Sequence, residues 1–250
     1  MVLSGVAVCP GAPFLLAGVA EALAARMNLV VEACRAAVRG LPEADSVTLL
    51  TTGRSTPDGL AFRELPVGSA IPMTSVQRSD LQLPPINLPT SPPRTATTPP
   101  VMDPAVGTMV GAALLDNAGC TWPVTAVEVV DPAGTANMLL PLTKSSERVA
   151  LLVIADGAAC HGDDAPGRRD DRSTGFDAAI SAALAAGSPA ELSAACADRS
   201  LAGDLLASVE PLDVLARLAA TGPPAAADVL FAGAPVGVGY WVANWRWTDR

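Results

Sequence analysis

Apolar residues along this chain form short continuous runs that alternate with longer stretches of helical spacing. The first short run, residues 5–9, predicts a strand, and residues 16–40 carry apolar side chains at helical spacing. A second short run, residues 46–50, predicts another strand. This order is typical of a β-α-β unit, whose two strands we expect to form a parallel pair.

The same alternation continues along the rest of the chain. Further helices are predicted at residues 106–118, 176–186, 189–196 and 202–220, and further strands at 123–130, 148–155, 228–232 and 240–247. The run at 148–155 is the most hydrophobic, which predicts a central strand. A glycine-rich turn at 233–239 is expected to join the last two strands.

Residues 54–100 interrupt this pattern and predict an irregular insertion. From residue 84 onward the insertion holds too many prolines for a helix interior or a central strand. We expect it to be a surface excursion of one α/β domain that spans residues 1–250. The expected fold is a central mixed, largely parallel sheet flanked by helices.

Composition narrows the possible partners and the location. Half of the residues are apolar and 16% are charged, which is typical of a globular protein, and the net charge of -9 argues against nucleic-acid binding. The chain holds no uninterrupted apolar run of about 20 residues, so no membrane span is expected. Five widely spaced cysteines without a C-x-x-C pattern, and a first segment without a basic region, favour a cytoplasmic protein with reduced thiols.

The chain has a single histidine, His161, directly after the predicted central strand. In α/β proteins the carboxyl ends of the strands carry catalytic groups, and imidazole is the usual general base. Asp156 or Asp163 could orient the ring, which makes this segment a candidate catalytic site. The alternative is a solvated histidine in a surface loop. Nucleophilic catalysis by Cys160 with His161 is not favoured, because neighbouring side chains on an extended chain point apart.

Two other segments invite a functional interpretation. The loop that follows His161 mixes carboxylates with arginines, and we expect an ion-paired loop, not a metal site. The glycines of the 233–239 turn do not match the dinucleotide-binding pattern. The aromatic side chains after this turn are predicted to cover a sheet face or to contact a partner: Tyr240, Trp241, Trp245 and Trp247.

Three segments together resemble the class III extradiol ring-cleavage dioxygenase superfamily, which includes the B subunit of protocatechuate 4,5-dioxygenase and the Memo-like proteins. They are the opening strand and proline-containing turn at 6–16, the second strand and its loop at 45–53, and the strand with its turn at 149–161. The C-terminal half is most similar to an actinobacterial branch that lacks the metal ligands. The resemblance implies the B-subunit fold, with His161 at the position of the catalytic histidine. It also implies a pocket at Gly11, Ala12, Gly53, Cys160 and Asp163.

The metal ligands of the active members have no counterpart here. Those enzymes hold Fe(II) with two histidines and a glutamate, which must converge on one ion. Gly11 stands at the first histidine position, residues 52–54 contain no histidine, and no glutamate follows Glu210. We therefore expect no metal and no cofactor.

Several functional hypotheses stay open at this point. The first is a pseudoenzyme that binds a small molecule or a partner. The second is a divergent enzyme, either a ring-cleavage dioxygenase or a metal-independent lyase or hydrolase with His161 as general base, oriented by Asp156 or Asp163. The third is a subunit of a homo-oligomer or of a complex with a small partner, because the resembled B subunits assemble in these ways.

Overall fold

The computed structural model describes residues 2–15, 24–53, 61–65, 105–140 and 147–248. The strands in these residues are β1 (Val2–Cys9), β2 (Ser46–Thr52), β3 (Ala61–Leu65), β4 (Val124–Val129), β5 (Arg148–Ile154), β6 (Ala226–Gly233) and β7 (Tyr240–Arg246). The helices are α1 (Ala24–Arg39), α2 (Val106–Asn117), α3 (Pro132–Leu139), α4 (Arg172–Ala186), α5 (Pro189–Ala195), α6 (Arg199–Asp204) and α7 (Glu210–Ala219). A short 3₁₀ turn, η1 (Pro13–Leu15), follows β1.

The strands form one sheet in the order β3-β4-β2-β5-β1-β7-β6. Strands β4, β2, β5 and β1 are parallel, whereas β3 runs antiparallel to β4, and β7 runs antiparallel to both β1 and β6. This confirms the mixed, largely parallel α/β sheet and the central position of β5. The predicted β-α-β unit differs from the expectation in one respect: β1 and β2 are parallel but are not neighbours in the sheet. Each of them pairs with β5 instead.

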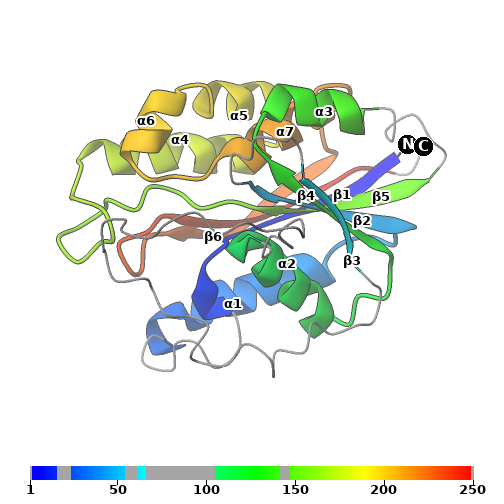
Figure 1. Ribbon diagram of the computed structural model, residues 1–250, viewed down its shortest axis with the longest axis horizontal. Coiled ribbons are helices and arrows are strands. Elements are labelled where there is room, and N and C mark those ends of the chain that lie inside the picture. The colour runs from blue at the N-terminus through cyan, green and yellow to red at the C-terminus, as the bar shows by residue number, and fades with distance from the viewer. Residues whose placement is uncertain (1, 16–23, 54–60, 66–104, 141–146, 249–250) are drawn as a thin grey trace, which may run out of the picture.

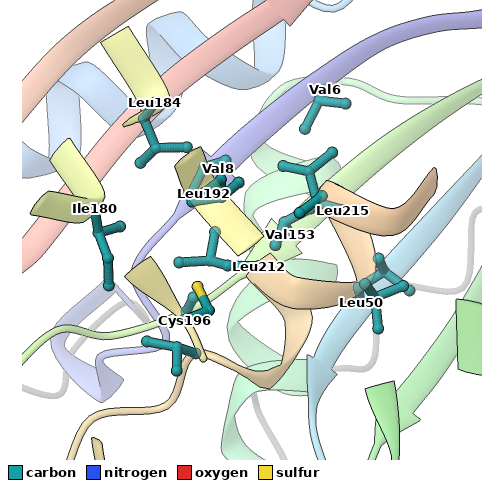
Figure 2. Packing of buried hydrophobic residues seen from close by; sticks show 14 of the residues in the cluster. Val6, Val8, Leu50, Val153, Ile180, Leu184, Leu192, Cys196, Leu212 and Leu215 are labelled. Atoms are coloured by element: carbon teal, nitrogen blue, oxygen red, sulfur yellow. The ribbon is translucent and has the colours of Figure 1, made fainter. Parts of the chain in front are cut away.

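Helices cover both faces of the sheet (Figure 1). Helices α3 to α7 lie on one face, and α1 and α2 lie on the other. The strands serve both layers because their side chains alternate. Thus Val6 and Val8 belong to the core beneath α4, α5 and α7, whereas Ala7 and Cys9 belong to the core beneath α1 and α2. Figure 2 shows aliphatic side chains of α4, α5 and α7 packed against those of the strands.

The predicted helix at 202–220 is wrong, because the structure has two helices there. Helix α6 ends at Asp204, and Leu206 adopts a left-handed conformation with φ of 56°. Helix α7 begins only at Glu210, with a proline in its first turn. Leu205 and Val209 remain fully buried, so the apolar pattern continues through the break and hides it.

Two further elements depart from the predictions. Helix α3 was not predicted from its apolar spacing, although Asp131 caps it by accepting a hydrogen bond from Ala133 N at 3.0 Å. Strand β3 lies within the segment predicted to be irregular, and it forms because it pairs with β4. Residues 66–104, which include the proline-rich part of that segment, lie outside the described residues.

The aromatic side chains of β7 cover the sheet from within the protein. Tyr240, Trp241 and Trp245 are all less than 5% exposed, which favours the predicted sheet cover over the predicted partner contact. Trp245 Nε1 donates to Leu184 O at 2.8 Å, and this bond ties α4 to the sheet. No helix in the described part of the chain combines the length and the apolar character needed to cross a membrane.

Asn244 joins three elements in the core, and its replacement gives a first prediction. Its Nδ2 donates to Val6 O at 3.3 Å and to Ala37 O at 2.9 Å, so β7 is bonded to β1 and to α1. Asn244→Leu leaves the Ala37 carbonyl without this donor and is expected to cost about 1–3 kcal/mol in urea unfolding. The matched variant Asn28→Leu, at an exposed position of α1, should change the free energy of unfolding by less than about 0.5 kcal/mol.

Candidate functional site

The candidate site lies where β1 and β5 end. Ala155 N donates to Cys9 O at 3.0 Å, and this bond holds the segment after β5 against the end of β1. Asp156 then pairs with the loop between α6 and α7: its N donates to Ser208 Oγ at 3.0 Å, and Ser208 N donates to Asp156 O at 2.9 Å. The break between α6 and α7 therefore supplies a wall of the site.

Asp156 closes the turn that follows β1. Its Oδ1 accepts a hydrogen bond from Gly11 N at 3.0 Å. Burial raises the pKa of the Asp156 carboxyl to about 6, although the bond from Gly11 opposes that change. A Cβ atom at position 11 would lie 3.0 Å from both Asp156 Oδ2 and Ile154 Cγ2. A side chain at position 11 would therefore require Asp156 and Ile154 to shift by a few tenths of an ångström.

His161 is oriented by Asp177 of α4. The distance from His161 Nε2 to Asp177 Oδ2 is 2.6 Å, and the two side chains are only 16% and 12% exposed. Asp177 Oδ1 accepts a second hydrogen bond, from Ala158 N at 3.0 Å. Burial raises the pKa of the Asp177 carboxyl, against the opposing effects of Ala158 and His161. His161 is therefore held by a hydrogen-bonded carboxylate, and the alternative of a solvated loop histidine does not hold.

The prediction that Asp156 or Asp163 orients the His161 ring is wrong. Asp156 bonds to Gly11, and Asp163 is exposed on the loop that follows His161. The residue that fulfils the role, Asp177, lies 16 positions after His161 within a helix. No local motif links the two positions, so only the packing of α4 against the turn after β5 reveals the pair.

Two glycines leave room for the Asp177 carboxylate. A Cβ atom at Gly157 would lie 2.6 Å from Asp177 Oδ1, and one at Gly239 would lie 1.7 Å from Asp177 Oδ2. Gly157 N donates to Gly239 O at 2.7 Å, and Gly239 N donates to Ala158 O at 2.8 Å. The predicted turn between β6 and β7 is confirmed, and its last glycine also borders the candidate site.

The other predicted pocket residues lie around this centre but do not all face it. Cys160 is buried, and its Sγ contacts Leu205 O at 3.6 Å. Ala12 is buried in the core beneath α1 and α2. Gly53 lies against β4, where an added Cβ would meet Glu128 and Val130. The structure thus brings Gly11 to Asp156 and His161 to Asp177, while Ala12 lies in the core and Gly53 lies beside β4.

The loop after His161 is ion-paired, as predicted. Arg172 Nη2 lies 2.7 Å from Asp170 Oδ2, and Arg169 Nε lies 3.3 Å from Asp171 Oδ1. The hydrogen bonds from Arg172 lower the pKa of the Asp170 carboxyl to about 2. The loop encloses an open surface cavity of about 450 Å³, lined by Asp163, Gly167, Arg168, Arg169 and Asp171. His161 is not among the residues that line this cavity.

Helix α2 begins at the same edge of the sheet and is anchored by a buried carboxylate that sequence reasoning missed. Glu128 of β4 is 8% exposed and accepts hydrogen bonds from Ala105 N at 3.0 Å and from Thr108 Oγ1 at 3.4 Å. Thr108 in turn bonds to Thr51 of β2 at 3.2 Å. Gly107 Cα lies 3.8 Å from the position that a Cβ at Gly11 would take, so Glu128 holds the helix start beside the site.

The anchoring role of Glu128 gives a second prediction. Glu128→Ala removes the acceptor of the buried Ala105 N–H and leaves the Thr108 hydroxyl with its bond to Thr51, which should lower the free energy of unfolding by about 1–3 kcal/mol. Differential scanning calorimetry measures the loss. The comparison variant Glu32→Ala removes an exposed carboxylate whose salt bridge in the described part of the chain is with Arg35, and a loss below about 0.5 kcal/mol is expected. Equal losses in the two variants would contradict the anchoring role.

The described residues do not fit the iron site that the resembled family implies. Within them, no three His, Cys, Asp or Glu side chains converge as a metal site requires. Gly11 offers no donor side chain, and a Cβ atom there would lie only 3.0 Å from the Asp156 carboxylate. The one imidazole already has a carboxylate partner on Nε2.

Comparison with known proteins supports the fold. The structure is similar to that of the uncharacterized protein JW3007 from Escherichia coli K12, with a TM-score of 0.50 and 14% sequence identity. The alignment covers 96% of this chain and 99% of that protein. No protein-family model and no curated protein matches the chain. At this level of identity the likeness shows a shared α/β fold, and any function must be argued from the site itself.

Proposed function

We propose that this chain is an extradiol-dioxygenase-like protein that has lost the Fe(II) site and binds a small molecule at the carboxyl edge of its sheet. The observation that carries the proposal is the turn at Gly11. In the resembled family this position provides the first imidazole, whereas here it provides a backbone N–H that is bonded to Asp156. The exchange argues against an iron centre, because a facial triad needs three donor side chains.

The remaining polar groups suit the recognition of a small molecule. Ligands of open α/β sheets bind beyond the carboxyl ends of the strands, where Asp156 and His161 lie. A few fixed polar groups among apolar walls are the usual composition of such sites. Asp156 is held by Gly11 and His161 by Asp177, so both are fixed before any ligand arrives.

The single histidine makes the proposal directly testable by NMR. The imidazole signals of the 250-residue chain all belong to His161, so no assignment is needed. Titration with Fe(II) under anaerobic conditions should leave these signals as sharp as those of a control titrated with Mg²⁺. Stoichiometric paramagnetic broadening in the wild type, absent when a chelator is added, would refute the loss of the iron site.

A second candidate function, proton transfer by His161, is favoured by the 2.6 Å distance to Asp177. An ionised carboxylate only accepts hydrogen bonds, so the neutral ring must carry its proton on Nε2. The lone pair then resides on Nδ1, which is the nitrogen that would take a proton from a substrate. Asp177 would orient the ring and stabilise the imidazolium, as the third member of a catalytic triad does.

The protonation of this ring gives a third prediction. The ¹⁵N spectrum of neutral His161 should show the tautomer protonated on Nε2 in more than about nine of ten molecules. The tautomer protonated on Nδ1 would place the Nε2 lone pair against the carboxylate. Asp177→Asn should bring the populations of the two tautomers closer together, since an amide can either donate or accept a hydrogen bond. Asp163→Asn, an exposed change on the adjacent loop, should leave the spectrum unchanged. A wild-type ring with its proton mainly on Nδ1 would contradict the proposed role of Asp177.

A further inference from the structure

Strand β6 forms one edge of the sheet, and only one of its residues is charged. Only β7 pairs with it among the described strands. A free edge presents a row of backbone N–H and C=O groups that can bind another strand, and proteins usually block it with charged side chains. The opposite edge strand, β3, includes Arg63 and Glu64, whereas β6 reads Ala-Ala-Asp-Val-Leu-Phe-Ala-Gly.

The single charge of β6 is neutralised within the sheet. Asp228 Oδ2 lies 2.6 Å from Arg246 Nη2 of the adjacent strand β7. In a chain with a net charge of -9, most of the surface opposes the approach of a second copy. The β6 edge is an exception, because its only carboxylate already has its counter-ion.

Exposed apolar side chains accompany this neutral edge. Leu230 is 43% exposed at a bulge in β6, where the pairing with β7 shifts between Val229 and Phe231. Leu29 of α1 is 74% exposed, the most exposed large apolar side chain in the described part of the protein. It shares a face of α1 with Arg26, whose guanidinium donates to the carbonyl of Pro235, just beyond β6.

We propose that two copies of the chain associate through antiparallel pairing of their β6 strands, which continues the sheet from one copy into the other. The interface comprises the β6 edge with Leu230, flanked by Leu29 of α1. A second copy is the occupant that these features favour, because an antiparallel pair of identical strands is self-complementary about a two-fold axis. Charge at this edge does not oppose the pairing, because the Asp228 carboxylate of each copy is already paired with Arg246.

Sedimentation velocity of the full chain tests this pairing. At about 200 μM, where even a micromolar interface is mostly occupied, the wild type should sediment with twice the 25.3 kDa mass of one chain. Leu230→Lys should weaken the association at least tenfold, because it places a charge on each copy at the pairing edge. Leu206→Lys, at a 59% exposed position between α6 and α7, should leave the association unchanged.

Two outcomes would overturn the proposal: a wild type that stays monomeric at this concentration, or a dimer that both lysine variants affect equally. Circular dichroism establishes that each variant is folded. Should Leu230→Lys fail to fold, hydrogen exchange on the wild type replaces it. Backbone amides of residues 226–233 should then exchange more slowly at about 200 μM than at about 1 μM, and equal rates would overturn the pairing.

Discussion

Gly239→Ala is expected to destabilise the folded protein by about 2–4 kcal/mol and to separate His161 from Asp177. The added methyl group would lie 1.7 Å from Asp177 Oδ2 and 2.6 Å from Asp177 Cγ, so the carboxylate must move. It cannot move freely, because Ala158 N and the imidazole both hold it. The expected cost combines steric overpacking, about 1–3 kcal/mol, with a weakened hydrogen bond to a charged group.

The matched control for this variant is Gly175→Ala on α4, the helix that carries Asp177. A Cβ atom at Gly175 meets nothing within 4 Å, and alanine favours a helix over glycine by about 0.5–1 kcal/mol. Urea unfolding should therefore show one alanine substitution that destabilises the protein and one that stabilises it. An unfolding midpoint for Gly239→Ala equal to that of the wild type would show that Asp177 is not confined as described.

Acidification from pH 7 to pH 4 should add roughly 2 kcal/mol to the free energy of unfolding through Asp156 alone. Its pKa is about 6 in the folded protein, against 3.8 for the unconstrained side chain, so the folded state binds the proton more tightly. This stabilisation is fully present below pH 3.8 and is lost as the pH rises through 6. The raised pKa of Asp177 acts in the same direction.

Asp156→Asn isolates this contribution. The amide oxygen can still accept the hydrogen bond from Gly11 N, but the side chain no longer titrates. The difference in unfolding free energy between wild type and variant should therefore change by roughly 2 kcal/mol between pH 4 and pH 7, with the variant relatively more stable at pH 7. Asp163→Asn serves as the exposed control. Parallel pH profiles for the wild type and Asp156→Asn would contradict the burial of an ionisable carboxyl at this position.

The strands and most helices could be predicted because apolar periodicity reports directly which faces are buried. The hydrophobic run at 148–155 predicts a central strand, and six of the seven residues of β5 are buried. The elements that escaped prediction depend on other information. Strand β3 forms only because β4 offers it a partner, and α3 depends on the Asp131 cap more than on its apolar spacing. Buried leucine and valine side chains carry the apolar pattern across the break between α6 and α7.

The candidate site was only half predictable, for a similar reason. Asp156 and His161 follow a buried strand, so their position at the carboxyl edge could be inferred from the sequence. Their partners could not, because Gly11 lies 145 residues from Asp156 and Asp177 belongs to a separate helix. Gly239 illustrates the same limit. The glycine-rich segment around it indicates a turn, whereas the contact of Gly239 with Asp177 depends on how that turn packs against α4.

The most direct test of the lost iron site is the iron content of the protein after anaerobic reconstitution with excess Fe(II) and removal of unbound metal. Inductively coupled plasma mass spectrometry should find far less than one iron per chain, with the same low value for His161→Ala. The reason is that Gly11, which is bonded to Asp156, provides no side chain to complete the three donors of an iron site. One iron per wild-type chain, lost when His161 is replaced, would contradict the proposal.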